Sequence, residues 1–276
     1  MLDTLLFKPM MQFCLLFLGL VATVETVVEA IHLSSGQARP QVSASSGYWY
    51  EHVKHNGINP VIANGTSWKV FRNVKDYGAK GDGVTDDTDA IQRAINEGNG
   101  VYTRDQDRFG TTGQPAVVYI PSGAYIVSRQ INNTVGTVLM GNPMDRPIIK
   151  AGANFTGSIL LFGRDRIVAG LGGFYHEIKH LVLDTTVIPQ QTIGLLEWGV
   201  SQACQLYNVK FNMAVGAAGH VGIFTATFVS PLIMNDLQFV GGGIGFIATA
   251  TQYHMKNWYF KGEVVSNKSI AGVEEY

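Results

Sequence analysis

Polar and hydrophobic positions alternate in a five-residue pattern that recurs four times in the second half of the chain. Each copy opens with a polar residue and has hydrophobic residues at its second and fourth positions; the copies span 180–184, 208–212, 236–240 and 257–261. Their spacings of 28, 28 and 21 residues indicate a strand that recurs once per turn of a solenoid. Because alternate side chains of a strand share a face, the pattern predicts these inward-facing residues: Leu181, Leu183, Val209, Phe211, Leu237, Phe239, Trp258 and Phe260.

A different pattern upstream predicts a strand over 68–74, a glycine-rich turn and an amphipathic helix whose hydrophobic stripe contains residues 90, 91, 94 and 95. Glycines in the turn allow backbone angles that a side chain forbids. Four aspartates form a predicted structural cap motif for the helix: Asp82, Asp86, Asp87 and Asp89. We expect Asp86 to cap the helix, and Asp87 and Asp89 to place negative charge against its first N–H groups.

Cation binding is an alternative role for these aspartates. Their spacing does not provide the alternating oxygen ligands, central glycine and final glutamate of an EF-hand loop. We therefore predict a turn and a helix cap, without a metal. The glycines also lack the residues of a phosphate loop or a dinucleotide fingerprint, so no cofactor is predicted.

The remaining chain consists of short β segments separated by Gly, Asn and Asp. Residues 116–127 predict two strands about a Pro-x-Gly turn, and further segments lie at 137–140, 148–150 and 158–162. A β-sandwich would also show short strands, but the repeat, the glycine content and the single opening helix favour an all-β, right-handed parallel β-helix with one N-terminal capping helix. Helical bundles and doubly wound folds need long segments of 3.6-residue period, which are absent.

Composition agrees with a β-rich protein and limits its partners. The chain has 276 residues, a formal net charge of −1, 46% hydrophobic residues, 15% charged residues and 32 glycines. No basic stripe favours nucleic acid or an acidic membrane surface. The charge balance also gives no electrostatic reason to expect a polyanionic substrate.

The N-terminus predicts secretion. Lys8 precedes a hydrophobic run over 10–22, and small residues before a cut after Ala30 complete a signal peptide over 1–30. The run is short for a membrane span, so we expect no membrane association after cleavage. Residues 31–46 predict a flexible mature N-terminus, and residues 47–276 a single β-helix domain. The protein is expected to be extracellular and monomeric.

Modification sites and cysteines fit the same route. Four sequons give candidate N-glycosylation sites at Asn64, Asn132, Asn154 and Asn267. Cys14 lies in the signal peptide, which leaves Cys204 as the mature chain's one cysteine and excludes an internal disulfide. Its apolar context predicts a buried residue, rather than a nucleophile.

No self-contained catalytic motif is present: the chain has no G-x-S-x-G, H-E-x-x-H or paired CxxC. The histidines show no metal-ligand spacing within a predicted helix. Few carboxylates follow the predicted helix, so Asp184, Glu197 and Asp236 are the candidates for acid–base chemistry. Each has an alternative role as a solvated turn or coil residue.

Several motifs resemble those of fungal glycoside hydrolase family 55, which has a pectate-lyase-like β-helix fold. They include Tyr-Trp-Tyr-Glu at 48–51, the segment 71–83, Leu-Asp-Thr-Thr at 183–186 and Val-Ser-Gln-Ala at 200–203. The resemblance runs from Tyr48 to Phe260. It implies an extracellular exo-acting glucan 1,3-β-glucosidase with two tandem β-helices, which releases glucose from β-1,3-glucan with inversion.

The resemblance also implies where chemistry would occur. In the family the general acid is a glutamate of the second β-helix, whereas this chain resembles the first, so we expect a fragment with little activity alone. The implied catalytic-cleft residues are Ser201, Gln202 and His220. The implied substrate-binding residues are Trp198, Glu197 and Asp184. Trp198 would stack on a pyranose, and a core position is its alternative.

Two departures weaken the cleft that the resemblance implies. Gly199 and Val221 stand where family members carry glutamines, so groups that could hold a sugar or water are lost. A non-catalytic β-glucan-binding module and a polysaccharide lyase or rhamnogalacturonase-like protein therefore remain as alternatives. A lyase would need a cluster of acidic Ca²⁺ ligands, which the sequence does not show.

Overall fold

The computed structural model describes residues 48–57, 59, 68–98, 113–165, 172–225, 232–249 and 252–262. The chain divides into two compact units, Met1–His52 and Val53–Tyr276. Within the first unit, the described residues include one 3-10 turn, η1 (Trp49–Glu51). The predicted signal peptide, the predicted flexible segment over 31–46 and the sequons at Asn64 and Asn267 lie outside the described residues.

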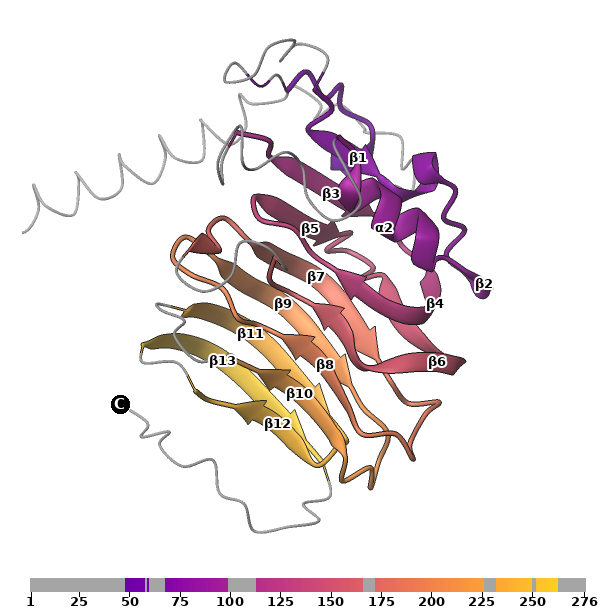
Figure 1. Cartoon of the computed structure of the whole chain (residues 1–276), viewed down its shortest axis with the longest axis vertical. Coiled ribbons are helices and arrows are strands. Elements are labelled where there is room, and N and C mark those ends of the chain that lie inside the picture. Colours follow the sequence, from indigo (N-terminus) through magenta and orange to yellow (C-terminus); the bar gives the residue numbers. More distant parts are fainter. Residues whose placement is uncertain are drawn as a thin grey trace, which may run out of the picture. The chain divides into compact units, whose positions relative to one another are not determined.

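The second unit is a parallel β-helix whose strands form three ladders (Figure 1). Ladder 1 contains β1 (Phe71–Asn73), β3 (Ala116–Ile120), β5 (Thr137–Gly141) and the first halves of β7 (Glu177–Asp184), β9 (Gln205–Asn212), β11 (Leu232–Val240) and β13 (Tyr253–Lys261). Ladder 2 contains β2 (Asp82–Asp86), the starts of β4 (Ala124–Asn132) and β6 (Ile148–Phe162), and the second halves of β7, β9, β11 and β13. Ladder 3 contains the ends of β4 and β6, then β8 (Ile193–Glu197), β10 (His220–Phe224) and β12 (Ile244–Ile247).

All of these pairings are parallel, and each coil visits the three ladders in turn. Parallel strands of one sheet are connected with a right-handed crossover. The predicted right-handed parallel β-helix is therefore confirmed. One departure is local: residues 82–86, predicted as part of a turn, form strand β2 against β4.

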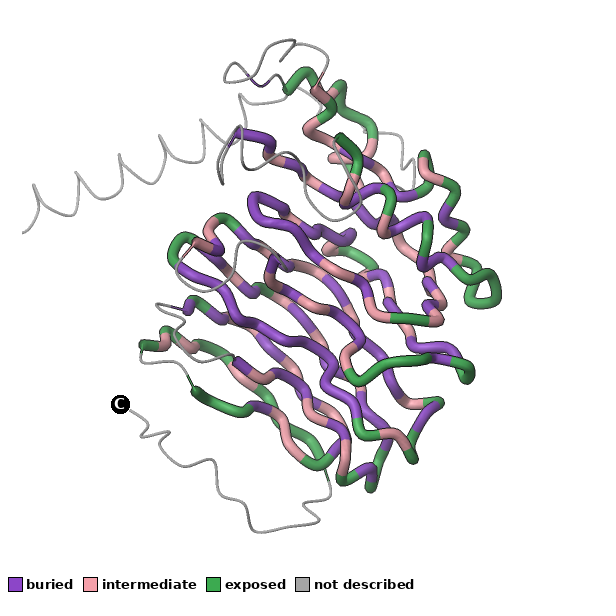
Figure 2. The backbone as a smooth tube through the Cα atoms, viewed as in Figure 1, coloured by how far each residue is buried: buried purple, intermediate pink, exposed green. Residues whose placement is uncertain are grey.

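The predicted repeat is confirmed by the strand register. Leu183 pairs with Phe211, Phe211 with Phe239, and Phe239 with Phe260, at the offsets seen in the sequence. The phenylalanine rings stack at 4.9 Å and 4.7 Å between centroids. Phe211 and Phe239 are buried, whereas Phe260, which faces inward in the same register, is 45% exposed. It belongs to the last described coil, so no further described strand covers it (Figure 2).

The polar residue that opens each repeat lies at the corner between ladders 1 and 2. These four corner residues, His180, Asn208, Asp236 and Asn257, have φ of 60°, 53°, 57° and 55°. Left-handed backbone angles are uncommon outside glycine, and Asn, Asp and His tolerate them best. The repeat therefore encodes the corner as well as the strands beside it.

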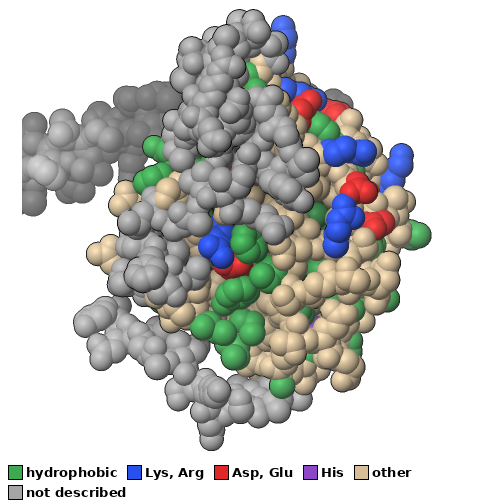
Figure 3. Space-filling model, in the orientation of Figure 1, with side chains coloured by type: hydrophobic (Ala, Val, Ile, Leu, Met, Phe, Trp, Pro, Cys, Tyr) green, Lys and Arg blue, Asp and Glu red, His purple; other side chains and the backbone are tan. Residues whose placement is uncertain are grey.

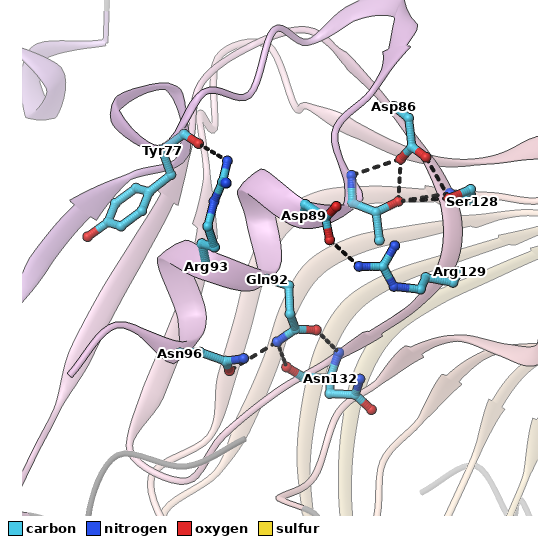
Figure 4. Close-up of polar contacts among 10 residues, drawn as sticks. Tyr77, Asp86, Asp89, Gln92, Arg93, Asn96, Ser128, Arg129 and Asn132 are labelled. Carbon is cyan, nitrogen blue, oxygen red and sulfur yellow. Dashed lines mark hydrogen bonds and ion pairs between the residues drawn. The ribbon is translucent and has the colours of Figure 1, made fainter. Parts of the chain in front are cut away.

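Helix α2 (Thr88–Asn96) covers the N-terminal end of the core with the predicted stripe of Ala90, Ile91, Ala94 and Ile95, all buried. Polar contacts attach it to β4 (Figure 4). The Ser128 backbone N–H donates to the Thr88 hydroxyl at 2.9 Å, and Arg129 forms an ion pair with Asp89. Farther along, the Asn132 backbone N–H donates to the Gln92 side chain at 2.8 Å. The helix is thus fixed at both ends of its outer face.

The aspartates of the predicted cap motif have separate roles. Asp86 lies one residue before the N-cap position, which is Asp87, and its carboxylate accepts a hydrogen bond from the backbone N–H of Thr88, the first helical residue. The expectation for Asp87 is wrong, because its carboxylate turns back to accept from the N–H groups of Lys80 and Gly81. Asp82 accepts from the backbone N–H groups of residues 85 and 84, which lowers its pKa to about 2. The motif closes a turn as much as it caps a helix.

Candidate functional site

Glu197 ends β8 at the downstream edge of ladder 3, and its side chain is buried although it faces away from the core. Its Oε1 atom lies 2.7 Å from Nε of Arg164, which follows β6. The Arg164 guanidinium in turn packs over the ring of Phe162, 4.9 Å from the centroid. The ladder places Phe162 and Phe224 on either side of Glu197. Aromatic neighbours therefore shield this ion pair from water.

Two opposing effects act on the pKa of Glu197. Burial raises its pKa, and Arg164 opposes that shift. Of the carboxyl groups in the described ranges, Glu197 is the one whose pKa is raised, whereas those of Asp82 and Asp86 are lowered. A buried carboxyl group with a shifted pKa and a specific charged partner is a candidate for a functional role.

Trp198, which directly follows Glu197 in the chain, and Asn133 both lie beside the buried side chain of His176. The Asn133 Nδ2 lies 3.3 Å from His176 Nδ1, and the Trp198 ring lies 6.5 Å from the His176 ring. Asn133 Oδ1, Trp198 Nε1 and Ser201 Oγ are buried without a hydrogen-bond partner among the described residues. Buried polar atoms of this kind are normally satisfied by ordered water or a ligand.

Trp198 itself is fully buried and belongs to the hydrophobic core. Its position agrees with the core alternative, and in this structure the ring presents no exposed face for a pyranose. A role in stacking on sugar has no support from this geometry. Ser201 is buried beside it, and Gln202 is exposed.

His220 and Asp184 lie elsewhere: His220 begins β10 at the upstream edge of ladder 3, and Asp184 ends β7 in ladder 2. His220 pairs in register with Ile193, four residues before Glu197, which places it about 13 Å away along the strand. Its Nδ1 lies 3.0 Å from the Thr185 hydroxyl, and its Nε2 lies 3.1 Å from the Ile188 carbonyl. The structure therefore does not bring His220 together with Glu197.

Asp184 is committed to local structure. One carboxylate oxygen accepts from the backbone and hydroxyl of Thr186, and the other accepts from the Asn212 side chain at 2.6 Å. Asp236, the remaining acid–base candidate, is a corner residue between ladders 1 and 2. The sequence candidates thus occupy three separate places, and their functional roles stay predictions.

His220 should make folding stability depend on pH. Burial lowers its pKa from 6.5, so the unfolded chain takes up a proton that the folded chain resists. Stability is therefore complete above pH 6.5 and is lost as pH falls through 6.5 toward the lower folded pKa. We expect a smaller free energy of unfolding in urea at pH 5 than at pH 7.5.

The matched variants are His220→Gln, which should flatten this pH dependence, and His254→Gln on exposed strand β13, which should leave it unchanged. His180 also has a pKa lowered by burial, followed by the charges of Lys179 and Arg146, so some dependence should remain in His220→Gln. An equally steep dependence in His220→Gln would contradict the assignment.

Cys204 is buried, and burial raises the pKa of its thiol to about 11. Its thiol contacts the Gly173 carbonyl at 3.2 Å. A thiol with this pKa is a poor nucleophile at neutral pH. The predicted burial of Cys204 is confirmed.

Sequence reasoning missed Arg164 and Asn133. Arg164 reaches a carboxylate 33 positions later, and Asn133 a histidine 43 positions later. No local motif surrounds either residue, and the coil lengths set these contacts. These two contacts could have been predicted only from the exact register between the strands of ladder 3.

Charged side chains are few on the viewed face of the molecule (Figure 3). Figure 3 shows charged side chains gathered toward α2 at the upper right, whereas much of the remaining surface is uncharged or hydrophobic. No group of three or more His, Cys, Asp or Glu within the described ranges could hold a metal ion. No described helix is long and apolar enough to cross a membrane.

Comparison with known proteins identifies fungal relatives. The chain is 35% identical over 265 residues to a glucan 1,3-beta-glucosidase of Cochliobolus carbonum, covering 91% of this chain and 32% of the relative. It is 37% identical over 230 residues to a probable glucan endo-1,3-beta-glucosidase of Arthroderma benhamiae, covering 80% of this chain and 26% of the relative. The chain therefore spans about a third or less of these proteins. The resemblance to fungal β-1,3-glucanases is confirmed.

A solved structure and a family match complete the comparison. The A-module of the mannuronan C-5 epimerase AlgE6 from Azotobacter vinelandii aligns with a TM-score of 0.46 and 19% identity, covering 69% of this chain and 56% of that one. Residues 71–273 match the family described as rhamnogalacturonase A/epimerase, pectate lyase-like. This match includes nearly all of the β-helix, and the chain belongs to that family.

Proposed function

We propose that this chain is the β-helix part of an enzyme that hydrolyses β-1,3-glucan from chain ends and releases glucose. The observation that carries the proposal is its 35% identity, over 91% of its length, to a glucan 1,3-beta-glucosidase. Because the chain spans about a third of that relative, we expect it to bind glucan and to hydrolyse it slowly when it acts alone.

The ion pair of Glu197 and Arg164 supplies the chemistry that fits this function best. A carboxyl group with a raised pKa can hydrogen-bond a sugar hydroxyl or hold a proton, and a guanidinium can donate to hydroxyl oxygens. Asn133 Oδ1, Trp198 Nε1 and Ser201 Oγ are buried without partners among the described residues. Because these atoms are buried, we assign them to ordered water rather than to the saccharide.

The test is an assay of the purified chain on laminarin, with released glucose measured over time and its anomer identified by NMR. We expect slow release of α-glucose and at least a tenfold loss in Glu197→Gln, which keeps the shape of the side chain. Glu177→Gln is a control, because that carboxylate forms a partly buried ion pair with Lys179 on ladder 1. Neither release nor binding of laminarin would contradict the proposal.

A second candidate is a non-catalytic β-glucan-binding module. The observation in its favour is that the side-chain polar atoms of Asp184 and His220 already form hydrogen bonds within the fold. Binding of laminarin without glucose release, even at high protein concentration, would favour this module over the hydrolase.

We also propose that the protein is secreted and glycosylated. The signal-peptide pattern and the sequons support this route. Of the two described sequons, Asn154 and Thr156 are exposed, whereas Asn132 is half-buried in β4 and Thr134 is fully buried. Mass spectrometry of protein secreted from a yeast host should find a new N-terminus after Ala30 and a glycan on Asn154, with Asn132 unmodified. An uncleaved N-terminus would contradict secretion through this signal.

A further inference from the structure

An open groove of about 420 Å³ lies along the corner between ladders 1 and 2. Its lining residues come from β9, β11 and β13, which pair in that order (Figure 1). They are Tyr207, Asn208, Asp236, Gln238, Asn257 and Tyr259. The volume lies within the range of small-molecule sites. The groove is separate from Glu197, which lies at the far edge of ladder 3.

Two tyrosines form the ends of the groove. Tyr207 lies on β9 in ladder 1 and Tyr259 on β13 in ladder 2, and their side chains are 38% and 54% exposed. Because β11 separates these strands, the tyrosines are two coils apart, or about 10 Å along the axis. The Tyr207 ring packs edge-on against His180, with centroids 5.4 Å apart. At least this ring is therefore held in a defined orientation.

The floor of the groove is built from corner residues whose side chains are held by hydrogen bonds. Arg146 donates to Asn208 Oδ1 at 3.0 Å and approaches Gln238 Oε1 at 3.3 Å. The Asn257 Nδ2 donates to Asp236 Oδ1 at 2.9 Å. These bonds fix which polar atoms face outward.

Three atoms of the floor keep hydrogen-bonding capacity within the described part of the chain. Asp236 Oδ2 and Asn257 Oδ1 remain as acceptors, and Gln238 Nε2 remains as a donor. Left-handed corners hold Asp236 and Asn257 one above the other. Two acceptors and one donor thus line the groove together with the two tyrosines.

We propose that this groove binds a short uncharged oligosaccharide. Pyranose rings present apolar faces that pack on aromatic rings, and equatorial hydroxyls that both donate and accept hydrogen bonds. The spacing of about 10 Å between the tyrosines along the axis matches two to three sugar units. The Asp236 carboxylate disfavours anionic ligands. Of the two cations close to Gln238, Arg146 already donates to Asn208 and Gln238, and Lys210 pairs in register with Gln238 on the neighbouring strand.

The choice of a β-1,3-linked sugar as the first probe rests on the proposed function. Bound there, a glucan chain would attach to the protein at a place remote from Glu197. The groove would then raise affinity for long chains without taking part in bond cleavage. This separation makes the two proposals independently testable.

The test is isothermal titration calorimetry of the full chain with laminaritriose, cellotriose and trigalacturonic acid. Tyr207→Ala and Tyr259→Ala should each raise the Kd for the neutral sugar at least tenfold. Tyr207→Phe and Tyr259→Phe keep the ring and should stay within about threefold of wild type. Tyr175→Ala, which removes an exposed tyrosine outside the groove, should bind within twofold of wild type. Thermal melts of all variants exclude loss of folding as the cause.

Each outcome decides between the proposals. The proposal that this groove binds sugar would be overturned by wild-type affinity in both alanine variants. It would also be overturned if the wild-type chain bound neither neutral trisaccharide. Binding of trigalacturonic acid in preference to the neutral sugars would also overturn it. Loss of cellotriose binding in the tyrosine variants, with no binding of laminaritriose, would support the groove and count against β-1,3-glucan as the substrate. Tyrosine variants that no longer bind the trisaccharide but still release glucose from laminarin would support both the sugar-binding groove and the proposed hydrolase function.

Discussion

Phe211→Ala should destabilise the β-helix by about 3–5 kcal/mol, the usual cost of removing a buried phenylalanine ring. Phe211 is fully buried and stacks on Phe239, and Leu183 lies beside it in the preceding coil. The cavity would lie in the middle of the solenoid, where coils on both sides limit collapse. Because domains of this kind are stable by about 5–15 kcal/mol, urea unfolding should show a much lower midpoint.

The same row of residues provides the control. Phe260 has the same inward register and stacks on Phe239, but it is 45% exposed. Phe260→Ala should therefore cost about 1 kcal/mol, since little area leaves water there on folding. Equal losses in the two variants would contradict the stacking order of the coils.

Arg72→Met should destabilise the N-terminal cap by about 3 kcal/mol. Arg72 is 1% exposed beneath α2, where its guanidinium donates to the carbonyls of Ala94 and Ile95 at 2.9 Å and 3.2 Å. Carbonyls in the last turn of a helix have no partner within the helix, and a positive charge there is favourable. Methionine fills the space but leaves these buried acceptors unsatisfied, at roughly 1–3 kcal/mol each.

Arg129→Met is the matched control for Arg72→Met. Arg129 also pairs with α2, through Asp89, but its side chain is 51% exposed. Surface ion pairs of this kind contribute about 0–1 kcal/mol, so the variant should unfold near the wild-type midpoint. Hydrogen exchange of the α2 amides should accelerate in Arg72→Met and remain slow in Arg129→Met. Slow exchange in both would show that packing alone holds the helix.

Much of the fold could be predicted because its determinants are local and periodic. The alternation at Leu181 and Leu183 repeats at fixed offsets, and the stripe from Ala90 to Ile95 marks the helix. Such periods follow from strand and helix geometry, so each segment indicates its own buried face. The aspartate turn could be assigned to structure for the same reason, although the direction of the Asp87 side chain could not.

The candidate site could be predicted far less well. Glu197 was one of several dispersed carboxylates, and nothing near it in the sequence indicates the ion pair with Arg164. The resemblance grouped His220 with Ser201 and Gln202 because they belong to motifs of one family. The ladder places His220 at the other end of its strand from Glu197, where both ring nitrogens already have partners.

The sequence by itself determined that the chain forms a solenoid, which residues face its core and where its corners turn, since alternation and left-handed backbone preferences act within a few residues. Tertiary structure alone decided which polar side chains meet. The lengths of the coils set the register between distant segments, and that register buries Glu197 beside Arg164 and lines Tyr207 and Tyr259 along one groove. Burial and proximity depend on the whole stack, so the chemistry of these groups appears only after the coils have packed.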